Sequence, residues 1–105
     1  RPRVSRNGTY YPKRYTDWLE EAKWVMRVAC VRQNGGRLIE GPVGMEITFF
    51  GASRAADLDN LTKSVMDAAQ GTVLVNDKQV TDLKVSRLWS KNKKRTTVKI
   101  EDWRQ

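Results

Sequence analysis

The sequence has no histidine and only one cysteine among its 105 residues. The absence of histidine excludes a Ser-His-Asp triad, a nuclease site that depends on histidine, and every zinc site with a histidine ligand. A single thiol excludes an internal disulfide and an all-thiolate zinc site, and it suits a reducing compartment. Carboxylates, lysines and hydroxyl groups are therefore the side chains left for catalysis.

Long apolar runs are also absent. No stretch approaches the roughly 20 apolar residues needed to span a bilayer, and the start of the chain lacks the pattern of a signal peptide. We therefore expect a cytoplasmic protein with no membrane partner.

Positive charge is what the sequence has in excess. It contains 20 lysines and arginines against 12 acidic residues, a net charge of +8, which points to a polyanionic partner such as nucleic acid. A hydrophobic content of 39%, with four tryptophans, predicts a folded core. The length predicts a single domain over residues 1–105. The core of so short a chain is modest, and oligomerisation commonly supplements it.

The basic residues gather in two segments without acids. Residues 1–14 carry five of them and residues 83–100 carry seven, together twelve of the twenty. Such segments would contact phosphates and dominate affinity without reading base sequence, although a solvated loop is the alternative for the second one. The predicted DNA contacts are Arg1, Arg3, Arg6, Lys13, Arg14, Lys84, Arg87, Lys91, Lys93, Lys94 and Arg95.

The segment from about Thr16 to Gln33 has the periodicity of an amphipathic helix. Thr16 is the expected cap, Asn34-Gly35-Gly36 is the expected end, and Cys30 is expected to be a buried, unreactive thiol. The expected buried stripe is Trp18, Leu19, Ala22, Val25, Met26 and Ala29. Trp24, Val28 and Val31 form a second apolar strip, which is either further burial or a subunit interface.

The remaining pattern predicts an α+β domain with two helices and a small mixed β-sheet. Residues 43–50 alternate as a strand, and residues 60–69 make a short helix. Residues 80–89 and 96–100 make two more strands, expected to pair as a hairpin. The helix between the first two strands permits a right-handed parallel crossover. Two short extended pieces are expected on either side of Asn7-Gly8.

Residues 55–82 form an acidic segment inside this basic chain. Five aspartates and two lysines give the segment a net charge of −3. Mg²⁺ prefers oxygen ligands, usually one or two carboxylates together with water and substrate phosphate oxygens. Bound metal ions lower the pKa of water and bridge phosphate oxygens in nuclease sites. The acidic segment therefore favours a metal-dependent nuclease.

The spacing within this segment suggests roles but leaves alternatives. Asp57 and Asp59 lie where a strand gives way to a helix, so both can face one spot. Lys63 follows Asp59 by one helical turn, where it would stabilise charge on a phosphate or form only a surface ion pair worth ~0.3–0.5 kcal/mol. Asp59 or Asn60 is alternatively the helix cap. Asp77, in a turn before a strand, can supply a third metal ligand.

Three motifs in order, Asp57-Leu58-Asp59-Asn60-Leu61-x-Lys63, Asp67-Ala68 and Asp77-x-Gln79-Val80, resemble the RusA family of Holliday junction resolvases. The opening Arg1-Pro2-Arg3, with Gly8 and Tyr10, is similar to the basic start of that family. The resemblance implies a homodimeric, Mg²⁺-dependent endodeoxyribonuclease, encoded by a bacterium or phage. Such an enzyme cuts four-way DNA junctions with paired nicks in recombination and repair. The resemblance also assigns metal binding to Asp57, Asp59 and Asp77, and it makes Lys63 the catalytic cation.

One position departs from the family pattern. Many relatives have two consecutive acids where this chain has Asn76-Asp77, and the second acid, which is expected to bind metal, is kept. Asp67 and Asn60 are expected to orient the site from outside the ligand set. Asp67 is alternatively a solvated helix residue.

Two other functions compete with the nuclease. One is a non-enzymatic nucleic-acid-binding module, in which the aspartates only cap and solvate a helix. The other is an assembly protein whose basic surface meets an acidic partner. Neither needs several carboxylates beside bound DNA, so the aspartates and Lys63 favour the nuclease.

Overall fold

The structure is a computed structural model that describes residues 3–5, 8–10, 13–51, 57–91 and 94–104, with side chains described from Thr16 onward. Two helices and a three-stranded mixed sheet confirm the predicted α+β class. The elements in chain order are β1 (Arg3–Ser5), β2 (Gly8–Tyr10), α1 (Lys13–Asn34), β3 (Val43–Phe50), α2 (Leu58–Ala69), the three-residue 3-10 turn η1 (Asp77–Gln79), β4 (Val80–Leu88) and β5 (Arg95–Asp102).

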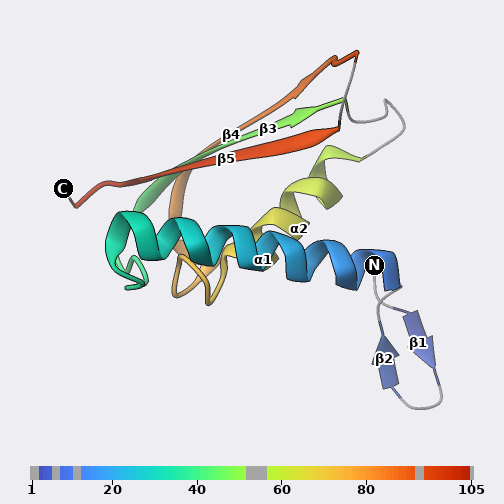
Figure 1. The fold of residues 1–105 in the computed structure, drawn as a ribbon, viewed down its shortest axis with the longest axis horizontal. Coiled ribbons are helices and arrows are strands. Elements are labelled where there is room, and N and C mark those ends of the chain that lie inside the picture. Colours follow the sequence, from blue (N-terminus) through green and yellow to red (C-terminus); the bar gives the residue numbers. More distant parts are fainter. Residues whose placement is uncertain (1–2, 6–7, 11–12, 52–56, 92–93, 105) are drawn as a thin grey trace.

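Strand β3 is the centre of the sheet. It pairs in parallel with β4 on one side and antiparallel with β5 on the other, so the predicted parallel crossover is confirmed (Figure 1). The predicted hairpin between the last two strands is wrong, because β3 lies between them. The reason lies in the burial of the three strands. Val43, Met45, Ile47 and Phe49 of β3 are all at most 3% exposed, whereas β4 and β5 contain no buried residue. The most buried strand takes the centre of the sheet, and the two exposed strands take its edges.

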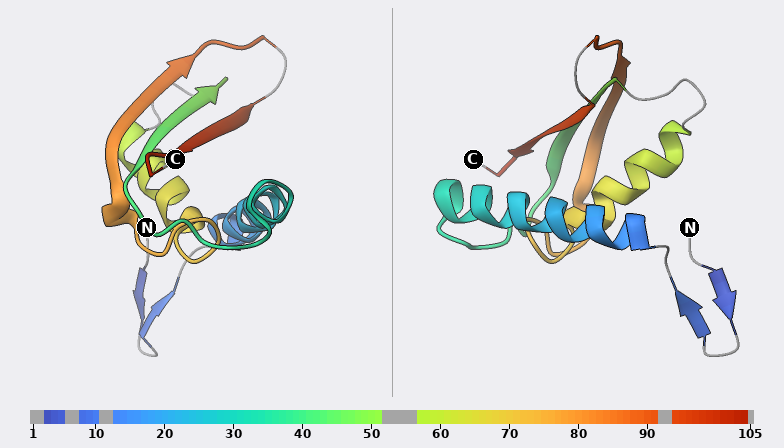
Figure 2. Two further views of the ribbon diagram at one scale, coloured as in Figure 1. Left: turned by 90° about the vertical axis from the view of Figure 1, so that its left-hand side faces the viewer. Right: turned by 45° about the vertical axis from the view of Figure 1, so that its right-hand side comes forward.

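Both helices lie on one side of the sheet (Figure 2). The core joins the inward side chains of β3 to Val65 and Ala69 of α2 and to Leu74. On the opposite face of β3, Glu46 is exposed. Figure 2 also shows β1 and β2 standing away from the rest of the molecule, and their pairing confirms the two predicted extended pieces. Among the described residues, no helix combines the length and apolar character that a membrane span requires.

Helix α1 differs from its prediction at its start and on its apolar face. It begins at Lys13, so Thr16 lies inside the helix rather than at its cap. Gly35 (φ 64°) and Gly36 (φ 81°) end it as expected, since glycine adopts positive φ without strain. Cys30 is buried, as predicted, and its thiol donates to the carbonyl of Arg37.

The apolar stripe of α1 is only partly buried. Met26 packs against the core, but Val25 is 61% exposed and Trp18 36% exposed, which corrects the predicted burial. The helix does not close fully onto the sheet. Between α1, α2 and β5 it leaves a hollow of about 660 Å³, the apolar hollow, whose walls include Trp18, Val25, Phe49, Leu61, Val65 and Val98. In the second strip, Trp24 is 67% and Val31 56% exposed, so further burial within the chain does not account for them.

Candidate functional site

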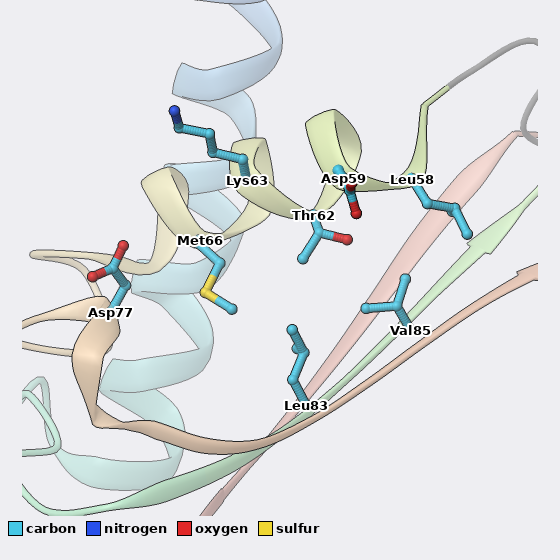
Figure 3. A pocket seen from close by; sticks show the side chains of 8 residues that line it. All are labelled: Leu58, Asp59, Thr62, Lys63, Met66, Asp77, Leu83 and Val85. Atoms are coloured by element: carbon cyan, nitrogen blue, oxygen red, sulfur yellow. The ribbon is translucent and has the colours of Figure 1, made fainter.

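A second hollow lies on the other flank of α2, facing β4 (Figure 3). Its volume is about 420 Å³, and its residues are Leu58, Asp59, Thr62, Lys63, Met66, Asp77, Leu83 and Val85. We call it the carboxylate hollow. Figure 3 shows Asp77 at one end of it and Asp59 toward the other end beside Leu58, with Met66 between the two carboxylates and with Leu83 and Val85 below on β4. The arrangement therefore sets two carboxylates and one lysine around an apolar floor.

The first acidic motif starts helix α2. The Asp57 carboxylate accepts a hydrogen bond from the Asp59 backbone N–H at 2.9 Å, and the Leu61 N–H donates to the Asp57 carbonyl at 3.0 Å. Asp57 is thus the N-cap, a role that carboxylates fill well. The capping alternative for Asp59 and Asn60 is wrong, and the helix starts at Leu58, two residues before the predicted start.

Asp59 is in the first turn of α2, where the helix dipole favours a negative charge. It is exposed and lines the carboxylate hollow, whereas Asp57 does not line it. Lys63 lines the hollow one turn further along the helix. Asp59 and Lys63 form no ion pair in the part of the chain that the structure describes. The lysine is exposed, and its side chain in Figure 3 extends away from the apolar floor.

Asp77 reaches the same hollow from η1. The Asn76 side chain caps this turn by accepting from the Lys78 N–H at 2.9 Å. The Gln79 side chain completes a capping box by accepting from the Asn76 N–H at 2.8 Å. At its other end the Gln79 amide donates to the carbonyls of Ile39 (2.6 Å) and Gly41 (2.9 Å). The acid that many relatives carry before Asp77 is thus replaced by a residue that caps the turn.

Sequence reasoning missed the two glutamines that hold this turn. Gln79 was noted only as part of the Asp77-x-Gln79-Val80 motif. The sequence did contain a signal for its structural role, namely the Asn-x-x-Gln spacing of a capping box. Gln70, at the C-cap of α2, accepts a hydrogen bond from the Asp77 N–H at 3.4 Å. No sequence signal indicates that contact, because it depends on how the chain returns after the helix.

The three predicted ligands do not form one cluster. Among the described residues, no group of three or more His, Cys, Asp or Glu side chains is placed to hold a metal. Asp59 and Asp77 share the carboxylate hollow, while Asp57 is directed to the helix start. Two carboxylates that leave positions for water and phosphate oxygens nevertheless match the donor set that Mg²⁺ usually takes. The donor chemistry therefore fits the ion when substrate supplies part of the shell.

The two residues expected to orient the site lie outside the hollow. The Asn60 carbonyl accepts from the Ser64 hydroxyl at 3.0 Å within α2, and Asp67 is exposed one turn beyond Lys63. Neither lines the carboxylate hollow.

The predicted DNA contacts of the second basic segment lie on β4 and β5 and in the connection between them. Lys84 pairs with Glu46 on the open face of the sheet, whereas Arg87 pairs with Phe49 on the face toward the helices. The Arg95 guanidinium lies 4.4 Å from the centre of the Phe50 ring. These side chains therefore lie on more than one surface of the protein. The side chains of Arg1, Arg3, Arg6, Lys13, Arg14 and Lys93 lie outside the described part.

Comparison with known proteins identifies one family. The model for Endodeoxyribonuclease RusA matches residues 1–101, a span that includes every residue of the carboxylate hollow. No curated protein matches the chain significantly.

Proposed function

Because this chain belongs to the RusA family of endodeoxyribonucleases, we propose that it cuts four-way DNA junctions by Mg²⁺-dependent, paired phosphodiester hydrolysis. Membership makes the chain a hydrolase of phosphodiester bonds and places it among enzymes that resolve Holliday junctions. We further propose that Mg²⁺ is the metal, that the nicks are paired, and that the protein acts in recombination and repair of bacterial or phage DNA.

The observation that carries the proposal is that Asp59, Lys63 and Asp77, from two separate elements, line one hollow. We propose that the carboxylates of Asp59 and Asp77 hold Mg²⁺ together with phosphate oxygens of the DNA. The bound ion would lower the pKa of a water molecule and polarise the phosphate. The apolar floor of Met66, Leu83 and Val85 would limit bulk water beneath the scissile group.

Asp57 is the third proposed ligand. Its Oδ1 accepts the capping hydrogen bond from Asp59. A carboxylate has a second oxygen with its own lone pairs, so capping and metal binding are compatible. In this arrangement the cap also fixes the start of α2 and hence the direction of Asp59.

Lys63 is the proposed catalytic cation. Hydrolysis develops negative charge on the phosphate oxygens, and a positioned positive charge stabilises it in the transition state. Lys63 is exposed, so it is free to approach a DNA phosphate at the edge of the hollow.

We propose that the described basic residues of the second segment bind the DNA backbone. Support comes from Arg87, which lies on the same face of β4 as Leu83 and Val85 of the hollow, whereas Lys84 lies on the opposite face. DNA held along β4 would therefore pass the carboxylates. The contacts would fix orientation without reading base sequence.

We also propose a homodimer. A four-way junction has approximate two-fold symmetry, and a two-fold dimer presents two sites for paired nicks. Support comes from α1, where Trp24, Val25 and Val31 are each more than half exposed, and from the apolar hollow beside it. Exposed apolar surface of this kind marks interaction sites.

The test uses a synthetic four-way junction and a linear duplex of the same sequence, with each strand labelled in turn. We expect symmetrical nicks in the junction in Mg²⁺, none in EDTA, and little cleavage of the duplex. Junction binding without cleavage in Mg²⁺ would instead favour a non-enzymatic binding module.

A further inference from the structure

The Gln79 side chain uses its whole amide to hold η1. Its oxygen accepts from the Asn76 N–H, and its nitrogen donates to the carbonyls of Ile39 and Gly41. A glutamine amide has two N–H donors and one carbonyl, so both donors are used. The reversed amide would set the NH₂ group against an N–H and the oxygen against two carbonyls. The three partners therefore fix one orientation.

The partners of Gln79 belong to the segment that enters the central strand β3. Ile39 is itself held there, because its N–H donates to the Val73 carbonyl at 2.8 Å and its carbonyl accepts from the Val75 N–H at 3.4 Å. Gly41 lies two residues before β3. Gln79 thus ties the turn that carries Asp77 to the segment that leads into β3, across 38 to 40 residues of sequence.

Hydrogen bonds hold η1 to the rest of the molecule. None of its three residues is buried, and Asp77 itself is exposed. On the α2 side the contact to Asp77 is the longer hydrogen bond from its N–H to Gln70, at 3.4 Å. An exposed turn without buried side chains keeps one conformation only while its hydrogen bonds last. Gln79 supplies those that anchor the turn to the segment before β3, at 2.6 and 2.9 Å.

We propose that Gln79 is a positioning residue for the metal site. By anchoring η1 to Ile39 and Gly41, it holds the Asp77 carboxylate in the carboxylate hollow that Asp59 also lines. The inference rests on the proposed function, because Asp77 is a metal ligand only there. Groups that orient metal ligands typically change metal affinity or activity roughly 10–100-fold when removed.

The test compares Gln79→Ala, which removes all three hydrogen bonds, with Gln79→Glu, which keeps the acceptor for Asn76 but has no N–H donors. Gln33→Ala, an exposed glutamine at the end of α1, is the matched control. Three quantities are measured: Mn²⁺ affinity of the free protein by electron paramagnetic resonance, the Mg²⁺ concentration for half-maximal junction cleavage, and junction affinity in EDTA.

For Gln79→Ala we expect Mn²⁺ affinity to fall roughly 10–100-fold and the half-maximal Mg²⁺ concentration to rise in parallel. Saturating Mg²⁺ should restore most of the cleavage rate. Junction affinity in EDTA should stay within twofold of the parent, and Gln33→Ala should change nothing. Gln79→Glu should show the same shift, and it serves as the test if Gln79→Ala does not fold.

A merely structural role gives a different result. If the Gln79 variants lose cleavage rate at every Mg²⁺ concentration while the Mn²⁺ affinity and the half-maximal Mg²⁺ concentration stay unchanged, the inference is overturned. Asp77→Asn separates this failure from that of the proposed function. An Asp77→Asn protein that binds Mn²⁺ and cuts junctions normally would refute the site itself. One that loses both, beside unaffected Gln79 variants, would refute only the role of Gln79.

Discussion

The two hollows on either side of α2 take different residues from the same helix. The carboxylate hollow receives Leu58, Asp59, Thr62, Lys63 and Met66, and the apolar hollow receives Leu61 and Val65. Both sets follow helical spacing, so one short helix presents an edge with two charged residues to β4 and a wholly apolar edge to α1 and β5. The difference matches the two proposed tasks, metal and phosphate binding on the first edge and contact with an apolar partner on the second.

Removing a carboxylate from the carboxylate hollow should have the largest effect of the variants that test the difference between the two hollows. We expect Asp59→Asn and Asp77→Asn to lower junction cleavage by roughly 10³-fold or more, because bound metal ions contribute several kcal/mol of charge stabilisation in the transition state. Junction binding, measured by gel shift in EDTA, should persist or tighten, since less negative charge faces the phosphates.

Asp82→Asn is the control for these variants, because Asp82 is exposed on β4 and lines neither hollow. It should cut at the parent rate. Full cleavage by Asp59→Asn and Asp77→Asn would remove the chemical distinction between the two hollows.

Lys63 should have the next largest effect. We expect Lys63→Ala to lower the cleavage rate on the order of 10²–10³-fold, the usual cost of removing one electrostatic donor from a transition state. Junction affinity should change little, because many other cations meet the DNA. Single-turnover cleavage and gel shift separate the two quantities. Lys23→Ala on α1 is the control, since Lys23 lines neither hollow.

A near-normal rate for Lys63→Ala combined with much weaker binding would make Lys63 a phosphate contact. The carboxylate hollow would then hold the metal without contributing a cation to catalysis.

Substitutions on α1 beside the apolar hollow should change dimer formation and not the cleavage chemistry. If α1 and the apolar hollow form the dimer interface, Val25→Lys should raise the dimer dissociation constant roughly tenfold or more, because it sets a charge in an apolar contact. Light scattering should give the parent twice the chain mass of 12.1 kDa. Glu20→Lys, a charge change at another exposed position of the same helix, should leave the mass unchanged.

A parent protein that stays at the monomer mass across micromolar concentrations would refute the dimer. A junction complex that contains one chain would do the same.

The sequence predicted well the features that depend on neighbouring residues and poorly those that depend on contacts between distant parts of the chain. The alternation of residues 43–50 predicted β3 over the bounds that the structure gives, because strand periodicity is a local pattern. The hairpin prediction for β4 and β5 failed, since their short connection favours direct pairing and only the burial of β3 places a strand between them. The predicted burial of Val25 was wrong for a similar reason. Periodicity identifies the apolar face of a helix but does not show how closely that face packs against the rest of the protein.

The site divides in the same way. The acidic motif and Lys63 were visible in the sequence, and three of the four predicted catalytic residues line one hollow. The role of Gln79 depends on partners 38 and 40 residues away, which no local pattern indicates. Asp57, Asp59 and Asn60 are all good N-capping residues, so the choice among them depends on the residue at which the backbone enters the helix. The extended backbone of Asp57 (φ −78°, ψ 117°) decides it.

The smallest predicted effect concerns this cap, and it separates the two roles of Asp57. Asp57→Ala should lower the free energy of unfolding by about 0.5–2 kcal/mol, because the Asp59 N–H loses its acceptor, whereas Asp57→Asn keeps a capping oxygen and should cost only a few tenths. Urea denaturation measures both. If Asp57 also binds metal, Asp57→Asn should still lose cleavage although its stability is retained, since a neutral amide replaces a charged ligand. A stable Asp57→Asn protein that cuts normally would confine Asp57 to the cap and leave Asp59 and Asp77 as the metal-binding pair.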